Sequence, residues 1–367
     1  MIKRIFFIFL FLFTLTSHAS NAQTQGEPLI VEHAIVHKVQ SAIVPGQIYE
    51  LRIGLPEGYQ NSPDKEYPIL VVLDGQWGFL LVSEIAGNLA QDGMIPEAIT
   101  VGITWGGEGD DPGLLRTRDF IRPNLPYIPN SGGANLFLSA LTDELIPYVE
   151  SLYRVGEKRV LLGVSLGGLF TSYAMLEKPG HFDGYIAIAG SYFMDWAYFD
   201  ERLALMYGAA DLKKVRSFLS VGSLDTNQVF VEMLNNSIES AGLKGFKHKY
   251  KVIKGVGHAG VEPIAYTRGL QYVFKRPFLK LSEEFLQQYA GEYEGGLEGF
   301  PPFPTTVSVV GVGTIAIGGE GEATEYIAES KTKFYIKGIN STAEFTEDGQ
   351  LIINSGGTLL YFNRVSQ

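Results

Sequence analysis

The chain contains no cysteine among its 367 residues. This absence excludes disulfide bonds, thiolate metal sites, a cysteine nucleophile and a lipid-modified cysteine. Basic residues are also few, since 29 lysines and arginines stand against 40 aspartates and glutamates and give a net charge of −11. This surplus of negative charge argues against binding to nucleic acid or to an anionic membrane surface through bulk electrostatics. The composition is still that of a globular protein, because 46% of the residues are apolar and 19% are charged.

The apolar run near the N-terminus is too short to cross a bilayer. Ile5–Leu15 covers 11 residues, whereas a spanning helix needs about 20. Lys3 and Arg4 precede this run, and a polar stretch with small residues follows it. The layout predicts a secretory signal peptide cleaved after Ala22 or Ala19, and therefore export, to a periplasm or beyond; an uncleaved anchor is the alternative. Removal of this leader would change the net charge from −11 to −13.

The middle of the chain alternates between strand-like and helix-like segments. Short continuous apolar runs suit strands that are buried on both faces of a parallel sheet. They occur at Ile69–Leu73, Ala98–Val101, Val160–Leu162, Tyr185–Ala189 and Phe218–Leu219. Helical spacing of apolar residues appears between these runs, and Pro147 predicts a kink or break in one such helix. After an antiparallel hairpin across residues 35–55, the sequence therefore predicts an α/β sheet flanked by helices.

The pattern changes again near Pro277. A short helix is expected over Leu281–Tyr289, with Ser282 as its N-cap. Beyond it the strand-like segments are Thr305–Ile317, Thr324–Ala328, Lys333–Ile336, Ala343–Thr346, Leu351–Ile353 and Thr358–Phe362. Glycine-rich turns join them, which predicts a small antiparallel β-barrel or sandwich. We thus expect a signal peptide (1–22), an α/β domain (23–277) and a small all-β domain (281–367).

A serine between two glycines follows the apolar run 160–162. Residues 163–167 read Gly-Val-Ser-Leu-Gly, and a helical pattern begins directly afterwards. In a strand–turn–helix setting this G-x-S-x-G sequence predicts a nucleophile elbow, because glycines at both flanks permit the tight turn that exposes the hydroxyl of Ser165. An ordinary glycine-rich turn is the alternative.

One histidine outside the leader is placed to serve as a general base. His258 lies in a loop between a late strand and a helix, at the carboxyl end where open α/β sheets place their sites. His33 and His37 precede the sheet, His181 lies at the wrong end of its strand, and His248 sits in a charged segment that we expect to be exposed. His258 is therefore the predicted base, with a surface loop histidine as the alternative.

The acid that orients this base should lie between the serine and the histidine in chain order. Asp225 ends the strand and loop at residues 218–225 and meets that condition. It could instead cap the helix that begins near Asn227. Asp195 and Asp200 are the other candidates.

Acyl transfer also needs hydrogen-bond donors for the oxyanion. The backbone N–H of Leu166, which follows the serine, is one expected donor. The N–H of Gln76 is the other, since Gly75 can turn the chain after an earlier strand so that this amide faces the site. A routine strand-end turn at Asp74-Gly75 is the alternative.

These motifs together resemble the putative esterase family of the α/β-hydrolases. That family includes siderophore (enterochelin-type) esterases, S-formylglutathione hydrolases, feruloyl esterases and the antigen 85 mycolyltransferases. The resemblance covers residues 30–277 and rests on four segments, 67–75 (YPILVVLDG), 116–120 (RTRDF), 163–168 (GVSLGG) and 257–258 (GH). Residues 281–367 are similar, more loosely, to a small β-barrel that follows some periplasmic β-lactamase-like proteins and esterases.

The resemblance implies a serine carboxylic-ester hydrolase that works through an acyl-enzyme. Ser165, Asp225 and His258 would form the triad, and the two amides named above the oxyanion hole. The sequence departs from the family at Val164, where relatives carry histidine or another polar residue. The position of Asp225 also varies, since some relatives have glutamate there and some use a Ser–His dyad.

Residues that could bind substrate flank these motifs. Arg116 and Arg118 could hold an anionic substrate, or Arg118 and Asp119 could form a structural ion pair. Trp77 and Tyr192 could line an aromatic pocket, although aromatic side chains more often belong to the core. Three acids within residues 105–111, together with the negative net charge, argue mildly against a ferric siderophore, which is anionic.

No zinc motif, P-loop or complete dinucleotide fingerprint is present, so no cofactor is expected. The expected partner is a small-molecule ester, with no nucleic acid and no integral membrane association. An acyltransferase of the same fold, or a non-catalytic binding protein on this scaffold, are the alternative functions. The sequence does not indicate an oligomeric state.

Overall fold

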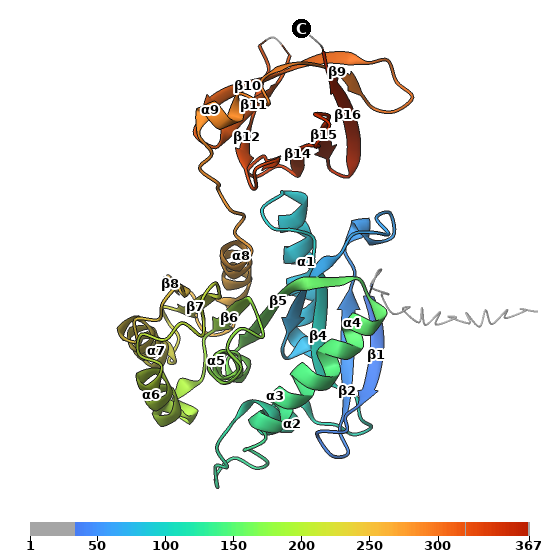
Figure 1. Cartoon of the computed structure of the whole chain (residues 1–367). Coiled ribbons are helices and arrows are strands. Elements are labelled where there is room, and N and C mark those ends of the chain that lie inside the picture. The colour runs from blue at the N-terminus through green and yellow to red at the C-terminus, as the bar shows by residue number, and fades with distance from the viewer. Residues whose placement is uncertain (1–33, 320, 366–367) are drawn as a thin grey trace, which may run out of the picture. The chain divides into compact units, whose positions relative to one another are not determined.

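A computed structural model describes residues 34–319 and 321–365, and the predicted signal peptide lies outside these residues. Eight strands form one sheet in the order β1-β2-β4-β3-β5-β6-β7-β8 (Figure 1). The strands are β1 (Ala34–Gln40), β2 (Ile48–Gly54), β3 (Tyr67–Val72), β4 (Ile99–Trp105), β5 (Val155–Val164), β6 (Gly184–Ile188), β7 (Arg216–Gly222) and β8 (Lys247–Ile253). β1, β2 and β4 pair antiparallel, and the remaining neighbours pair parallel. The predicted hairpin and parallel sheet are both confirmed.

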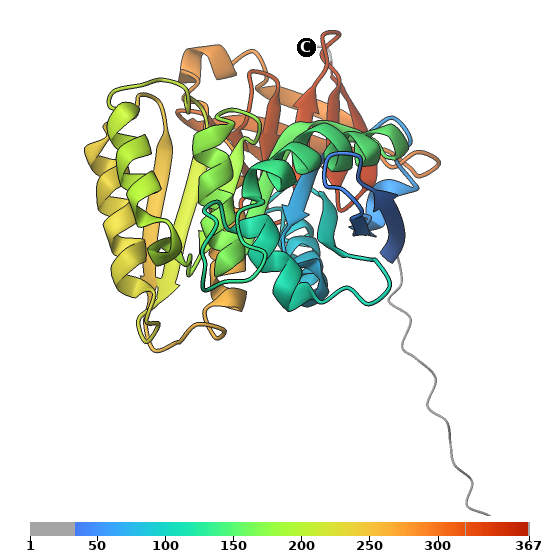
Figure 2. The ribbon, with the colours of Figure 1, turned by 90° about the horizontal axis from the view of Figure 1, so that it is seen from below.

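Helices cover both faces of this sheet (Figures 1 and 2). They are α1 (Gly75–Gln91), α2 (Pro112–Phe120), α3 (Ala134–Ala140), α4 (Ile146–Leu152), α5 (Leu166–Glu177), α6 (Trp196–Leu205), α7 (Gln228–Ser240) and α8 (Glu262–Val273). Helices α1 and α8 contact each other, and α8 packs on β6 so closely that a Cβ on Gly269 would lie 2.7 Å from Ile186. Helix α6 contacts both α5 and α7, and these three helices cover the opposite face. Parallel strands between two helical layers explain why the central strands are continuous apolar runs.

Pro147 breaks its helix as predicted. The break takes the form of a π-helical turn, η2 (Leu141–Leu145), between α3 and α4. Pro147 is the second residue of α4, which follows this π turn without a gap. The wide π turn therefore accommodates the proline, which has no N–H to donate, while residues 134–152 stay helical.

The C-terminal strands close into a barrel, so the barrel alternative of the prediction is confirmed. Its strands follow one another in the closed order β10 to β16 and then β9, and every pair is antiparallel. They are β9 (Gly291–Gly296), β10 (Phe303–Gly311), β11 (Thr314–Gly318), β12 (Thr324–Ala328), β13 (Lys333–Tyr335), β14 (Ser341–Phe345), β15 (Leu351–Ser355) and β16 (Thr358–Arg364). Aromatic side chains fill the interior, where Tyr289 stacks on Phe345 with ring centroids 4.2 Å apart. A short helix, α9 (Glu283–Leu286), precedes the barrel, and the Ser282 hydroxyl caps it by accepting a hydrogen bond from Phe285 N at 3.2 Å.

Two details of this barrel differ from the sequence prediction. The segment Thr305–Ile317 is not one strand, because a tight turn at Gly313 (φ +69°) divides it into β10 and β11. Strand β9 was not expected, since glycine has low strand propensity. Glycine is required there by close packing, because a Cβ on Gly295 would lie 2.0 Å from the Tyr361 carbonyl oxygen.

The prediction that His248 is exposed is wrong. Its ring packs parallel to Phe246, and its Nε2 lies 3.0 Å from Asn235 Oδ1 on α7. The Nδ1 atom is buried without a hydrogen-bond partner. This burial lowers the pKa of His248 to about 4. The lysines on either side of it, by contrast, are exposed, so only alternate residues of β8 face the core.

This burial makes the free energy of unfolding depend on pH. The unfolded chain takes up a proton on His248 below about pH 6.5, whereas the folded chain resists protonation down to about 4. The contribution of neutral His248 to the free energy of unfolding is therefore complete above pH 6.5. It decreases by about 2–3 kcal/mol as the pH falls toward 4. Urea unfolding between pH 4.5 and 7.5 should show this slope in the wild type. The His248→Gln variant should show a flatter profile, and parallel profiles would contradict the assignment.

Candidate active site

Ser165 occupies a strained turn between β5 and α5. Its backbone has φ 59° and ψ −117°, a conformation that side-chain-bearing residues rarely adopt. A Cβ on Gly163 would lie 2.2 Å from the Gly167 carbonyl oxygen, and one on Gly168 would lie 2.7 Å from that of Ile188. The glycines are thus required by close backbone approach. The Ser165 amide donates to Ile188 O at 2.9 Å, which fixes the turn against the end of β6.

His258 and Asp225 form a hydrogen-bonded pair at the carboxyl ends of β7 and β8. The His258 Nδ1 atom lies 2.8 Å from Asp225 Oδ2, so Nδ1 carries the proton and donates to the carboxylate. The Asp225 side chain is 1% exposed, whereas that of His258 is 45% exposed. The other carboxylate oxygen accepts from Asn227 N at 2.9 Å. Asp225 therefore both holds His258 and stabilises the turn before α7, two roles that the sequence presented as alternatives.

The loops that carry these residues are tied to one another. Leu224 N donates to Val256 O at 3.0 Å, which joins the Asp225 loop to the His258 loop. The Asn227 side-chain amide donates to Ala189 O at 2.9 Å, which joins the same loop to the end of β6. Asn227 was not identified from the sequence as part of the site. Its position two residues after the acid is the only signal that could have suggested this role.

The Ser165 hydroxyl lies 3.4 Å from the hydroxyl of Ser191. Among the residues that the structure describes, no hydrogen bond joins it to His258. Ser191 is buried and also donates its amide to Ser165 O at 3.2 Å. Catalytic hydrogen bonds are often long or poorly aligned before substrate binds.

The two expected oxyanion donors lie in the first turns of α1 and α5, the helices that follow the neighbouring strands β3 and β5. Leu166 is the first residue of α5 and Gln76 the second residue of α1, and N–H groups at these positions have no intrahelical acceptor. The two segments lie next to each other, because a Cβ on Gly167 would lie 3.4 Å from Asp74 Oδ2. Two unpaired N–H groups at neighbouring helix starts can stabilise a developing negative charge.

An ion pair supports the turn that carries Gln76. Asp74 is buried in a left-handed conformation (φ 53°) at the start of α1, and Arg116 binds both of its carboxylate oxygens at 3.0 and 2.7 Å. Burial raises the pKa of the Asp74 carboxyl, and the guanidinium of Arg116 opposes that rise. Arg116 is therefore occupied by a protein carboxylate rather than free to bind an anionic substrate.

Removing this partner should destabilise the fold strongly. The Arg116→Ala variant leaves the Asp74 carboxylate buried without a counter-charge, which we expect to lower the free energy of unfolding by about 3–5 kcal/mol. The matched control is Arg159→Ala, because the Arg159–Glu150 pair is partly exposed, at 30% and 28%. That control should cost less than about 1 kcal/mol in urea unfolding. Equal losses would show that burial gives the Asp74–Arg116 pair no more weight than the partly exposed Arg159–Glu150 pair.

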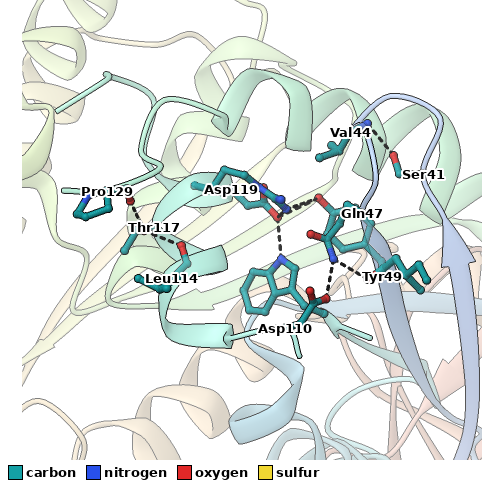
Figure 3. Close-up of polar contacts among 12 residues, drawn as sticks. Ser41, Val44, Gln47, Tyr49, Asp110, Leu114, Thr117, Asp119 and Pro129 are labelled. Atoms are coloured by element: carbon teal, nitrogen blue, oxygen red, sulfur yellow. Dashed lines mark hydrogen bonds and ion pairs between the residues drawn. The ribbon is translucent and has the colours of Figure 1, made fainter. Parts of the chain in front are cut away.

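Arg118 takes part in a second buried cluster, centred on Asp119 (Figure 3). Arg118 binds both oxygens of Asp119 at 2.7 and 2.9 Å, and Asp119 Oδ2 also accepts from Tyr49 Oη and Trp105 Nε1. The Asp119 side chain is 1% exposed. Of the two alternatives for Arg118, the structural ion pair with Asp119 therefore fits. The cluster attaches α2 to β2 and β4.

The two aromatic candidates lie in different surroundings. Tyr192 is fully buried, and its hydroxyl lies 2.8 Å from that of Ser172, so its ring belongs to the core and does not line an open pocket. Trp77 is 62% exposed, directly after Gln76, and the Arg116 guanidinium carbon lies 5.3 Å from its ring. Trp77 therefore remains available to a ligand, and Arg116 acts as its neighbour rather than as a separate anion site.

The other acid candidates do not approach the histidine. Asp195 is bound through both oxygens by Arg122, at 2.6 and 2.8 Å, and Asp200 is exposed on α6. Within the described part of the chain, no group of three histidines, aspartates or glutamates is placed to hold a metal ion. None of the helices in residues 34–319 and 321–365 combines the length and apolarity that crossing a membrane requires.

Comparison with known proteins shows the family of this chain. A family model described as "Putative esterase" matches residues 42–259. Ferri-bacillibactin esterase BesA of Bacillus subtilis (strain 168) is 27% identical over 270 residues, which are 64% of this chain and 88% of BesA. A siderophore triacetylfusarinine C esterase of Aspergillus fumigatus is 28% identical over 156 residues, 40% of this chain and 52% of the relative. The match to the family model ends before β9, so it does not include the barrel.

Two solved structures give the same picture. The BES protein from Bacillus cereus has a TM-score of 0.61 and 26% identity, and the match covers 69% of this chain and 99% of that one. An IroE-like serine hydrolase from Shewanella oneidensis has a TM-score of 0.59 and 25% identity, with 70% and 85% covered. The family resemblance drawn from the sequence motifs is confirmed.

Proposed function

Because this chain belongs to the putative esterase family and is a carboxylic-ester hydrolase, we propose that it cleaves a siderophore-type or other small acyl ester through an acyl-enzyme on Ser165. The names of two relatives, a ferri-bacillibactin esterase and a siderophore triacetylfusarinine C esterase, support the substrate class. The observation that carries the mechanism is the 2.8 Å pair of His258 and Asp225 on the same sheet edge as the strained Ser165.

In the proposed first step, His258 Nε2 accepts the Ser165 proton while Oγ attacks the ester carbonyl carbon. Since Nδ1 donates to Asp225, Nε2 is the unprotonated nitrogen and can act as the base. The carbonyl oxygen takes up negative charge and is stabilised by the N–H groups of Leu166 and Gln76. His258 then returns the proton to the departing alkoxide, which leaves an acyl group on Ser165.

In the second step, a water molecule takes the place of the leaving alcohol. His258 removes its proton as it attacks the acyl carbon, and the collapse of the second tetrahedral intermediate releases the acid and restores the Ser165 hydroxyl. The Ser191 hydroxyl, 3.4 Å away, is a hydrogen-bond partner for the Ser165 hydroxyl between turnovers.

The charges near the site bear on the form of the substrate. Arg116 and Arg118, the two cations of the family segment at residues 116–120, are each paired with a carboxylate. The net charge of −11 adds a repulsive background for anions. A ferric catecholate complex is strongly anionic, whereas the iron-free ligand keeps protonated catechols. We therefore expect the iron-free form of a catecholate lactone to be the better substrate.

An ester screen tests the proposed substrate. The values of kcat/KM should be compared for short p-nitrophenyl esters, longer acyl esters, and siderophore lactones with and without iron. A siderophore lactone should exceed p-nitrophenyl acetate by at least tenfold. Equal rates on every small ester would support an unspecific esterase, and transfer of the acyl group to an added alcohol would support an acyltransferase.

Export is the second part of the proposal. The basic and apolar N-terminal sequence supports a cleaved leader. Sequencing of the N-terminus of the protein purified from its native cells should give a chain beginning at Ser20 or Gln23. A chain that starts at Met1 would contradict export by this route.

We further propose that the barrel is not needed for the chemistry. The residues from Leu281 onward contain no histidine, and none of the proposed catalytic groups lies there. A chain truncated at Lys280 should remain soluble and hydrolyse p-nitrophenyl acetate with a kcat within tenfold of the full chain, while KM for larger esters changes. A folded truncated protein without activity on the smallest ester would show that the barrel completes the site.

A further inference from the structure

A basic pocket lies at the open edge of the sheet, between β8 and α8. Its volume is about 400 Å³, and five of its seven lining residues are cationic while none is acidic. The cationic residues are Arg216, Lys249, Lys251, Arg268 and Lys275. Among the residues that the structure describes, none of the five forms an ion pair with a carboxylate. This grouping is unexpected in a chain with a net charge of −11.

The pocket is organised around one aromatic ring. The Arg216 guanidinium carbon lies 5.7 Å and the Lys249 Nζ 5.6 Å from the centre of the Tyr272 ring. Two cations are thus held near the same ring by cation–π attraction. Lys158 is a further cation nearby. Burial lowers the pKa of Lys158, Asp183 opposes this, and Arg216 adds to the lowering.

Protection of the sheet edge explains only part of this arrangement. Lysines on an edge strand prevent pairing with another chain, and β8 is an edge strand of the sheet. That function accounts for Lys249 and Lys251. It does not account for Arg216, which lies on the interior strand β7, or for Arg268 and Lys275, which come from α8 and the residues after it. Like charges on three elements repel one another, which costs free energy of folding. A bound anion would remove this cost, and protection of the edge alone does not require so many cations.

We propose that this pocket binds a compact polyanion that carries at least two phosphate groups. Arginine matches a phosphate with two parallel N–H donors, and lysine supplies a mobile point charge to the same oxygens. The Gln271 side chain adds a neutral polar group to the lining. A small polyanion can lie within this open pocket, whereas an extended one would meet the repulsive field of the rest of this acidic protein.

The pocket is separate from the proposed catalytic residues. Arg216 is the first residue of β7, and Asp225 follows the last one. A strand of this length spans roughly 20 Å. A ligand held at Arg216 therefore does not need to affect ester hydrolysis, and the two proposals can fail independently.

Calorimetric titration of the full-length protein with tripolyphosphate at low ionic strength tests the site. We expect one binding event with a Kd in the micromolar range, and at least tenfold weaker binding of inorganic phosphate. The double variant Lys249→Gln/Lys251→Gln, at exposed positions that should not disturb folding, should weaken tripolyphosphate binding at least tenfold. The double variant Lys331→Gln/Lys337→Gln has the same net charge change on the barrel and should weaken it less than twofold.

Sedimentation with vesicles then identifies the source of the phosphates. Binding to vesicles that contain cardiolipin, a lipid with two phosphates, that is lost in the Lys249→Gln/Lys251→Gln variant would place them on a lipid. Tripolyphosphate binding without sedimentation would place them on a free ligand. Hydrolysis of p-nitrophenyl acetate should stay within twofold at saturating tripolyphosphate, which separates this site from Ser165. Absence of tripolyphosphate binding at millimolar concentration, or equal weakening in both double variants, would overturn the proposal.

Discussion

The Ser165→Ala variant should lose hydrolysis of every ester substrate, with kcat reduced on the order of 10⁵- to 10⁶-fold. The change removes only the attacking oxygen. The Ser165 turn is held by backbone contacts, including its amide bond to Ile188 O at 2.9 Å, so the fold and the substrate-binding surface should remain. The measurement is burst and steady-state kinetics on p-nitrophenyl acetate, together with a thermal melt that verifies folding.

The matched control is Ser191→Ala, which deletes the hydroxyl 3.4 Å away from the proposed nucleophile. Because the Ser191 hydroxyl only forms a hydrogen bond with the Ser165 hydroxyl and does not react, its removal should change kcat less than tenfold. A folded Ser165→Ala protein that keeps more than a tenth of the wild-type kcat would rule out Ser165 as the nucleophile. If Ser191→Ala were the more severe change, the nucleophile would have to be reassigned.

The sheet and the chain order of the catalytic candidates could be predicted because each depends on a local pattern. Continuous apolar runs indicate buried parallel strands, and a strand followed directly by G-x-S-x-G and a helix is typical of a nucleophile elbow. Topology then places the ends of β5, β7 and β8 on one edge of the sheet, which is where Ser165, Asp225 and His258 lie. The 2.8 Å pairing of the last two is consistent with this order.

The partners of individual side chains could not be predicted, because they come from distant segments. Tyr192 and Trp77 are both aromatic residues near a motif, yet one is fully buried and the other is 62% exposed. Arg116 is paired with Asp74, 42 residues earlier in the chain, and no local pattern announces such a contact. His248 stands between two lysines but faces α7, since alternate residues of a strand point to opposite sides.

The Asp225→Asn variant should lower kcat by up to about 10⁴-fold, while KM changes little. The structure gives a specific reason. One oxygen of Asp225 accepts a hydrogen bond from Asn227 N at 2.9 Å, and a donor there would face another donor. The replacement amide must therefore keep its oxygen toward Asn227 and turn its NH₂ group toward His258. His258 Nδ1 then has to accept a hydrogen bond, which moves the ring proton to Nε2 and prevents this nitrogen from taking the Ser165 proton.

The matched control for this change is Asp195→Asn, which makes the same carboxylate-to-amide replacement at the acid that the sequence offered as the alternative. Asp195 is bound by Arg122 and makes no contact with the histidine, so kcat should fall less than tenfold. If a wrong tautomer causes the loss, Asp225→Asn and Asp225→Ala should differ in the tautomer of His258. Alanine leaves Nδ1 free to bind water either as a donor or as an acceptor. NMR of the imidazole nitrogens should show the Nε2-protonated tautomer in Asp225→Asn and the Nδ1-protonated tautomer in the wild type. A loss below tenfold together with an unchanged tautomer would mean that His258 acts without Asp225, as in a Ser–His dyad.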